Sequence, residues 1–522
     1  MTDPNPHSNL PSSTPDRPVA PDFNIFPERD PNRAVPWPPP PAPPMGRDTP
    51  DKGSMRSRLW ATIIAVVAIL GVMTIQQVGA LTEEKVDTSV VAPPEAGDQY
   101  LLSSGITVKM TGLLRSLSGG NVPASQTQML AQSIEDGAVQ PVDKFRSLIV
   151  AAEVSGRDTV LPKLDQSAAT VEYPGSAEDF ATLRLIFEDR TDELSDAQKT
   201  ALTDRHGYYG RLALSLGLPD NDPSRQAFFR GSGGLLVFFI VLGIFAFGVT
   251  FAAITCFIIM IVRIAGGKVR AAFAPPMPGG SVYMETVAAL AAGFLVLQLL
   301  GSLVVGLLFK DKPEVALMAS LAMQWLLLPV IFWPVLRGVP LQEHARRIGW
   351  TRGQGVLREA GAGVFAYLAS LPIFVFIVVV MVIGIFAYEA IKHAGGQPQP
   401  PQVKNEILEI ISKGNPLVLA MFFLLATVWA PIVEESVFRG AMFRHLRGGW
   451  GVAAAAIVSS LAFGVMHGYA FFMLAPVIAL GCVFALMREW RGSLIAGITA
   501  HALHNGTLLA IAITMLTLAK PE

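Results

Sequence analysis

PLVLAMFFLLATVWAPIV, residues 416–433, runs without interruption into the polar hexapeptide EESVFR, residues 434–439. The apolar run is long enough to enter a bilayer, so the two carboxylates are expected on a membrane helix. An acidic residue near the centre of such a helix costs roughly 3 kcal/mol, which makes it a candidate functional group that needs a partner. Glu435 and Arg439 lie four positions apart on one helix face and can pair, whereas Glu434 points elsewhere and is left for chemistry. The alternative is that both acids mark the helix end at the lipid headgroups.

The composition of the chain is that of an integral membrane protein. Of its 522 residues, 51% are hydrophobic and 16% are charged, and the mean hydropathy is +0.45, which is too apolar for an ordinary soluble protein. The net charge of -1 and the short, scattered basic clusters do not indicate a nucleic-acid partner. Cys256 and Cys482 both lie in apolar runs, so a disulfide framework, a cysteine metal cluster and a thiol nucleophile lose support.

Three regions precede the main group of apolar runs. Residues 1–55 are rich in proline and are expected to form a disordered cytoplasmic tail. Residues 56–80 contain the apolar run Leu59–Ile75 behind a basic segment and are expected to form a signal-anchor transmembrane helix with its N-terminus in the cytoplasm. Residues 81–230 are polar with helical periodicity, which predicts a soluble, mainly helical insert large enough for its own core.

Eight further apolar runs follow, and together with the anchor they predict about nine membrane spans. Helices 2–5 fall in residues 231–400 and the last four in residues 401–522. The basic residues of the short loops gather after the second, fourth, sixth and eighth spans, so that side is predicted to be cytoplasmic and the insert extracytoplasmic. The fold class is therefore an all-α polytopic bundle in the cytoplasmic (inner) membrane. The runs cover about 235–262, 285–309, 315–336, 360–389, 416–434, 451–466, 471–487 and 493–515.

Isolated polar side chains recur on the apolar runs that follow Glu434. His467 lies within SSLAFGVMHGYAFF. His501 and Asn505 lie four apart on one helix face in AGITAHALHNGTLLA, with His504 one position off. Polar groups inside a membrane need partners, so a carboxylate, two imidazoles and an amide can meet among the last four helices. A lone histidine beside glycine is, however, more often a capping or packing residue.

Two kinds of chemistry suit this set. A carboxylate desolvated by apolar walls can act as a general base on water, while imidazole and amide donors hold the oxyanion of a peptide carbonyl. Alternatively, Glu434, His467 and His501 can bind zinc and leave one position open for water. The sequence contains no HExxH pair, which excludes a thermolysin-like helix, and no GxSxG elbow.

Three motifs follow one another on successive apolar segments: EExxxR at Glu434, Glu435 and Arg439, FxxxH at Phe463 and His467, and HxxxN at His501 and Asn505. This ordered trio resembles the CAAX-processing and bacteriocin-processing (CPBP) family of intramembrane proteases, also called the Abi or type II CAAX prenyl endopeptidase family. The resemblance covers residues 416–516 and fills every motif position. The long N-terminal region departs from the minimal core of the family.

The resemblance implies a helical bundle with a cavity reached from the cytoplasm or laterally from lipid, in which a peptide bond of a membrane-associated peptide or protein is hydrolysed. It implies that Glu434 activates water, that His467 holds or protonates that water, and that His501 with Asn505 stabilises the oxyanion. The supporting residues are Glu435, Arg439 and Phe463. The activity is glutamate-type or metal-dependent, with zinc as the candidate cofactor; the amide of Asn505 is a poor zinc ligand and favours the glutamate type.

Two alternatives to an enzyme remain. The first is a non-catalytic immunity or scaffold protein in which the polar cluster only packs helices. The second is a proton-coupled transporter, which is disfavoured because residues 235–400 contain no second copy of the Glu or His motifs. The expected partners are a peptide or protein substrate and membrane lipid; the sequence assigns no oligomeric state.

Overall fold

The computed structural model describes residues 51–83, 99–120, 122–138, 140–392, 411, 415–469 and 473–519. Within these ranges every regular element is a helix, which confirms the predicted all-α class. The predicted disordered tail up to residue 50 and the start of the predicted insert, residues 84–98, lie outside the described residues. Residues 51–54 lead into the first helix, and Asp51 among them is buried.

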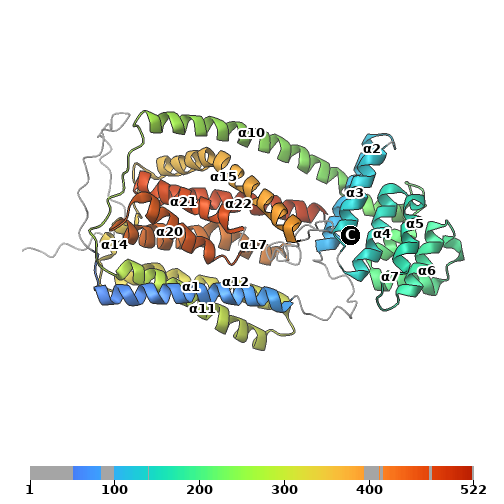
Figure 1. Cartoon of the computed structure of the whole chain (residues 1–522), viewed down its shortest axis with the longest axis horizontal. Coiled ribbons are helices and arrows are strands. Elements are labelled where there is room, and N and C mark those ends of the chain that lie inside the picture. The colour runs from blue at the N-terminus through green and yellow to red at the C-terminus, as the bar shows by residue number, and fades with distance from the viewer. Residues whose placement is uncertain are drawn as a thin grey trace, which may run out of the picture. The chain divides into compact units, whose positions relative to one another are not determined.

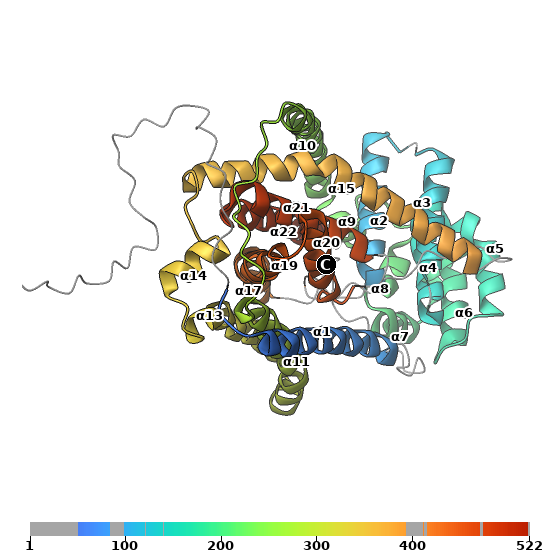
Figure 2. The same ribbon diagram turned by 60° about the vertical axis from the view of Figure 1, so that its left-hand side comes forward.

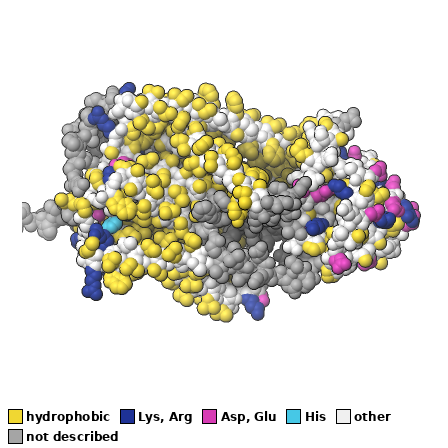
Figure 3. All heavy atoms as spheres, viewed as in Figure 1, with side chains coloured by type: hydrophobic (Ala, Val, Ile, Leu, Met, Phe, Trp, Pro, Cys, Tyr) yellow, Lys and Arg dark blue, Asp and Glu magenta, His cyan; other side chains and the backbone are white. Residues whose placement is uncertain are grey.

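Seven helical stretches of the described chain are long and apolar enough to cross a membrane, which makes the protein an integral membrane protein. They are Met55–Ile75, Pro223–Ala265, Val282–Leu308, Glu314–Leu336, Val356–Tyr388, Pro416–Arg447 and Ile495–Ala519. The first belongs to α1 (Met55–Glu83), and the longest helices are α10 (Ser232–Ala265) and α15 (Val356–Lys392). Figure 3 shows apolar side chains over much of the visible face of these helices.

Two of the nine predicted spans do not reach that length and composition. Helix α20 (Val452–Val465) has 14 residues, about 21 Å at 1.5 Å per residue, against a hydrocarbon core of about 30 Å. Helix α21 (Leu474–Arg491) has 18 residues and ends in the charged sequence REWR. The count of nine is therefore not confirmed and stays a prediction.

The bundle places its C-terminal helices between two helix pairs. On one side α1 packs along α11 (Val282–Leu308), and on the other α10 packs along α15. Between them lie α17 (Pro416–Leu424), α20, α21 and α22 (Ile495–Ala519), as both Figure 1 and Figure 2 show. The remaining membrane elements are α12 (Pro313–Met323), η2 (Gln324–Phe332) and α13 (Trp333–Leu336).

Charged side chains cross-link the helix ends at the end of the bundle where α1 begins. Asp51 accepts from Arg347 of α14 (Leu341–Ile348) at 2.8 Å and from Arg444 at 3.0 Å. Two bidentate pairs, Arg447–Glu489 and Arg491–Glu359, join further helix ends at 2.8–3.0 Å. Such paired arginine–carboxylate contacts hold geometry well, so the helices that carry the polar motifs are fixed at this end.

The insert has a hydrophobic core of its own. Aromatic and aliphatic residues between Tyr100 and Phe228 form one buried cluster around Phe145, Leu183 and Tyr209. Its elements are α2 (Gln99–Leu117), α3 (Ala124–Asp136), α4 (Pro141–Ser155), α5 (Arg157–Ala168), α6 (Ser176–Phe187), η1 (Thr191–Glu193), α7 (Asp196–His206), α8 (Tyr208–Ser215) and α9 (Pro223–Phe229). The side of the membrane on which it lies stays a prediction.

Candidate functional site

The two acids lie on a long helical segment with two widened turns. It begins at α17, where Asn415 accepts from the Leu417 and Val418 N–H groups at 3.0 Å and Pro416 occupies the first helical position. The segment continues through η3 (Leu425–Trp429), α18 (Ala430–Glu434), η4 (Glu435–Met442) and α19 (Phe443–Arg447). Both η3 and η4 have π-helical hydrogen bonds, which are rare and are frequent at functional sites.

Glu435 and Arg439 form the ion pair that their spacing predicts. Glu435 Oε1 lies 3.1 Å from Arg439 Nη1, and both side chains are fully buried. The Arg439 guanidinium also lies over aromatic rings, with its carbon 4.3 Å from the centroid of Phe463 and 5.3 Å from that of Phe484. A buried cation is thus compensated by one carboxylate and by two ring faces. Glu435 is therefore occupied by its ion pair with Arg439.

Two glycines make room for this pair. A Cβ atom on Gly481 of α21 would lie 2.7 Å from Ser460 Cβ and 3.0 Å from Arg439 Nη2. A Cβ atom on Gly497 of α22 would lie 3.0 Å from Glu435 Oε2. Neither glycine belongs to the motifs that predict the site. The signal that was available is a glycine inside an apolar helix, which costs about 1 kcal/mol against alanine and so requires a packing reason.

His501 lies between the two acids. Its Nδ1 is 3.1 Å from Glu435 Oε1 and its Nε2 is 3.7 Å from Glu434 Oε2. The ring stacks on Phe484 at 5.1 Å. Since an ionised carboxylate only accepts, the Glu435 contact assigns the proton to Nδ1 and leaves Nε2 of the neutral ring as an acceptor facing Glu434.

Glu434 is the open member of this group. Its side chain is 18% exposed, compared with 0% for Glu435 and 5% for His501. A carboxylate that contacts His501 and keeps part of its side chain exposed is a candidate to bind a water molecule.

His467 reaches this group through an aromatic ring. Its Nδ1 lies 2.7 Å from the Phe463 carbonyl oxygen, and its ring contacts the Phe463 ring edge-on at 4.6 Å. Phe463 in turn contacts the ring of His501 at 6.0 Å. A carbonyl oxygen only accepts, so Nδ1 of His467 donates and its Nε2 is an acceptor in the neutral ring. Within the described residues no hydrogen bond or ion pair joins His467 to Glu434.

Asn505 binds a carbonyl that the widened turn leaves without a donor. Its Nδ2 donates to Ala426 O at 2.8 Å. The Ala430 N–H group bonds to Leu425 O, five residues back, and the next residue in that register is Pro431, which has no N–H. Asn505 therefore satisfies Ala426 O and keeps one further N–H available. The neighbouring His504 faces α15, where its Nδ1 lies 3.1 Å from the Tyr367 hydroxyl.

The described side chains do not form a zinc site. Across those parts of the chain no three His, Cys, Asp or Glu side chains gather closely enough to hold a metal ion. Within the described residues Glu434, His467 and His501 are therefore not gathered as three metal ligands.

The fold and this cluster define a class: a helical integral membrane protein with a buried carboxylate–imidazole group on its C-terminal helices. A family model described as type II CAAX prenyl endopeptidase Rce1-like matches residues 416–507. This match agrees with the resemblance that the three motifs indicate, and the matched segment contains all seven motif residues. No curated protein and no solved structure matches the chain.

Proposed function

We propose that the protein is an intramembrane endopeptidase in which Glu434 activates water for attack on a peptide bond of a membrane-associated peptide or protein. The observation that carries the proposal is that Glu434 is the most exposed member of the series Glu434–His501–Glu435–Arg439. The family match supports it, since the matched family is one of proteases. The proposed location is the cytoplasmic membrane with the N-terminus inside.

The hydrogen bonds of the site support distinct roles for its members. Glu435 is held by Arg439 and by His501, so Glu434 is the carboxylate that can take the proton of the attacking water. The water oxygen bonds to the peptide carbonyl carbon, and the carbonyl becomes an oxyanion. When the oxyanion collapses back to a carbonyl, the C–N bond breaks and Glu434 returns the proton to the leaving nitrogen. His467 presents an acceptor nitrogen, which suits holding the water.

The donors to the oxyanion follow from the same hydrogen bonds. Asn505 keeps an N–H beyond the one that it gives to Ala426 O. His501 donates from Nε2 only when both of its nitrogens carry protons, because the neutral ring already gives its proton to Glu435. Asn505 is therefore the proposed resident donor, and His501 is a donor only in its protonated form.

A non-catalytic scaffold is the second candidate. One observation favours it: the polar groups of the cluster contact one another and the backbone, as expected of groups kept only for helix packing. The two candidates make different predictions: an endopeptidase has a turnover that depends on Glu434, whereas a scaffold cleaves no peptide.

The test is a cleavage assay with the full-length protein in lipid. The probes are a prenylated peptide ending in a CAAX sequence, as the matched family's description names, and the same peptide without the prenyl group. Glu434→Gln should lower turnover about 100- to 10,000-fold with unfolding temperature unchanged. The matched control is Asp311→Asn, which neutralises an exposed acid outside the site and should retain full activity. Cleavage by Glu434→Gln at the wild-type rate rejects the mechanism, and a folded wild type that cleaves neither peptide favours the scaffold.

A further inference from the structure

The segment 341–351, which consists of α14 and the three residues after it, lies outside the segment that the family model matches but is tied to helices inside it. Just before α22, the Leu494 N–H group donates to the Gly349 carbonyl oxygen at 2.9 Å. Near the end of α21, Arg488 Nη2 donates to the Arg347 carbonyl oxygen at 3.0 Å. Both contacts involve the backbone of the segment, so the segment itself is held against the two helices.

Trp350 of this segment reaches the helix that carries the two acids. Its Nε1 donates to the Ser436 hydroxyl at 2.9 Å. Ser436 is buried and directly follows Glu435 in the widened turn η4. Glu434 lies two positions before Ser436, about half a helical turn away, so Trp350 contacts the helix on a different side from the one where Glu434 projects. Any effect of Trp350 on Glu434 is therefore transmitted by the helix.

The position of Trp350 is fixed by its own contacts. Its backbone N–H donates to the Ala345 carbonyl oxygen at 2.7 Å, and its ring contacts the Phe332 ring edge-on at 5.6 Å. The backbone of η4 also approaches the segment closely, because a Cβ atom on Gly440 would lie 3.0 Å from Ile348 Cβ and 3.1 Å from the Ile348 carbonyl oxygen. Contacts as close as these leave η4 little room to shift against the segment.

We propose that Trp350 is a positioning residue that fixes the π-helical turn η4 and thereby the direction in which Glu434 points. This inference rests on the proposed function, because it assigns Trp350 a part in the turnover that Glu434 supports. A π-turn contains one more residue than an α-turn, so a change of register would rotate the side chains on its two sides by about 100° relative to each other. A hydrogen bond from a fixed ring into the turn selects one register. Small displacements of a catalytic group lower its rate strongly, so this bond should matter for turnover.

The test measures cleavage of the prenylated CAAX peptide by the full-length protein in lipid. Trp350→Phe keeps a ring next to Phe332 and removes the N–H donor, and Ser436→Ala removes the acceptor. Each variant should lower kcat roughly tenfold and leave KM within about twofold, because the acids are displaced while the substrate contacts remain. The double variant should be no slower than the slower single variant, because the same hydrogen bond is lost only once.

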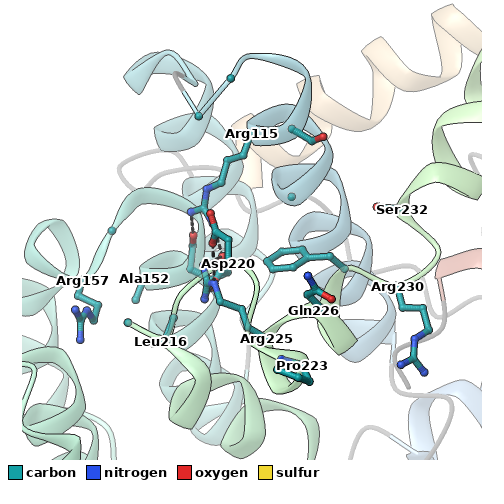
Figure 4. Close-up of a pocket in the computed structure, with 18 residues that line it drawn as sticks. Arg115, Ala152, Arg157, Leu216, Asp220, Pro223, Arg225, Gln226, Arg230 and Ser232 are labelled. Atoms are coloured by element: carbon teal, nitrogen blue, oxygen red, sulfur yellow. Dashed lines mark hydrogen bonds and ion pairs between the residues drawn. The ribbon is translucent and has the colours of Figure 1, made fainter.

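Three control variants separate position from packing and from stability. Trp450→Phe changes a tryptophan that is 49% exposed. Ser370→Ala removes a buried hydroxyl that bonds within its own helix. Arg225→Gln breaks a buried ion pair with Glu153 in the insert, at the cavity that Figure 4 shows. All three should keep the wild-type kcat, although Arg225→Gln should also lower the unfolding temperature.

Hydrogen exchange supplies a measurement that does not depend on activity. The backbone amides of η4 should exchange faster in Trp350→Phe than in wild type or Trp450→Phe, because the turn has lost an external hydrogen bond. If Trp350→Phe does not fold, Ser436→Ala gives the same comparison.

The possible results distinguish this inference from the proposed function. A wild-type kcat in Trp350→Phe and Ser436→Ala, unchanged exchange of η4, or losses that multiply in the double variant would overturn the positioning role and leave the proposed function standing. The same holds if Arg225→Gln lowers kcat as much as Trp350→Phe does. A folded wild type that cleaves neither the prenylated nor the unprenylated peptide rejects the proposed function, and the positioning role with it.

Discussion

Glu434 and Glu435 are neighbours in sequence with opposite surroundings, so the same substitution should act differently on each. Glu435→Gln leaves the buried Arg439 guanidinium without its carboxylate, which should cost about 3–5 kcal/mol of stability. Glu434→Gln keeps shape at a partly open position and should mainly lower turnover. Thermal unfolding in detergent beside single-turnover cleavage measures both. An equal fall of unfolding temperature in the two variants would mean that their roles are wrongly assigned.

A buried histidine outside the membrane spans should make the protein sensitive to acid. His344 of α14 is buried against the ring of Tyr283, and burial lowers its pKa from 6.5 to about 4. Between these two values the unfolded chain binds the proton and the folded chain does not, so stability falls as the pH falls from 6.5 toward 4. At pH 5 this single group should cost up to about 2 kcal/mol.

The check on His344 is the pH dependence of unfolding at pH 7 and pH 5 in wild type and His344→Phe. Phenylalanine keeps a ring next to Tyr283 and removes the titration. The variant should therefore lose less stability on acidification than wild type does. His206 of the insert, whose pKa burial also lowers, is present in both proteins and cancels in the comparison. Identical pH dependence in the two proteins would contradict the assignment.

At the scale of the element, one hydrogen bond joins the widened turn η3 to α22, from Asn505 to Ala426. Asn505→Leu removes the donor to Ala426 O and should destabilise the protein by about 1–3 kcal/mol, the cost of a buried carbonyl without a partner. Pro431→Ala restores a backbone N–H in the register of that carbonyl. The double variant should therefore be more stable than the sum of the single changes by about 0.5–3 kcal/mol.

The same double variant separates packing from catalysis. If Asn505 also stabilises the oxyanion, the double variant regains stability and stays slow in the cleavage assay. The unfolding free energy and the turnover are measured for the wild type, the two single variants and the double variant. Each quantity then gives one coupling energy between Asn505 and Pro431. Strictly additive losses of stability would show that Pro431 is not the reason that Asn505 is needed at Ala426.

The elements show which parts of the site a sequence can predict. Helical spacing alone places Glu435 beside Arg439, because residues four apart share a face. It cannot place Gly481 against Arg439 or Asn505 against Ala426, because those contacts join different helices and depend on how closely they pack. The widened turns cannot be predicted from the sequence either, because a π-turn differs from an α-turn by one shifted hydrogen bond and not by composition. Hydropathy likewise predicts a span at α20 without predicting that the helix has only 14 residues.

At the scale of the molecule, the start of the membrane bundle is tied to the candidate catalytic segment. Asp51, four residues before α1, pairs with Arg444 at the end of the helix that carries Glu434 and with Arg347 of α14. Asp51 and both arginines are buried, so these contacts are screened little by salt. The residues that lead into α1 thus contribute to holding the acid-bearing helix, although they lie outside the matched segment.

The basic loops predict the orientation of the whole chain, and this prediction can be tested directly. The loop that contains α14 carries several arginines, which predicts that it lies in the cytoplasm and that the insert lies on the other side. In a background with Cys256 and Cys482 replaced, Asp192→Cys in the insert should react with an impermeant thiol reagent on intact cells. Arg346→Cys, on an exposed position of α14, should react only after permeabilisation, because the membrane separates it from the reagent. Permeabilised cells, in which both sites should label, control for accessibility. Labelling of Arg346→Cys on intact cells would contradict the predicted orientation and place the insert on the cytoplasmic side.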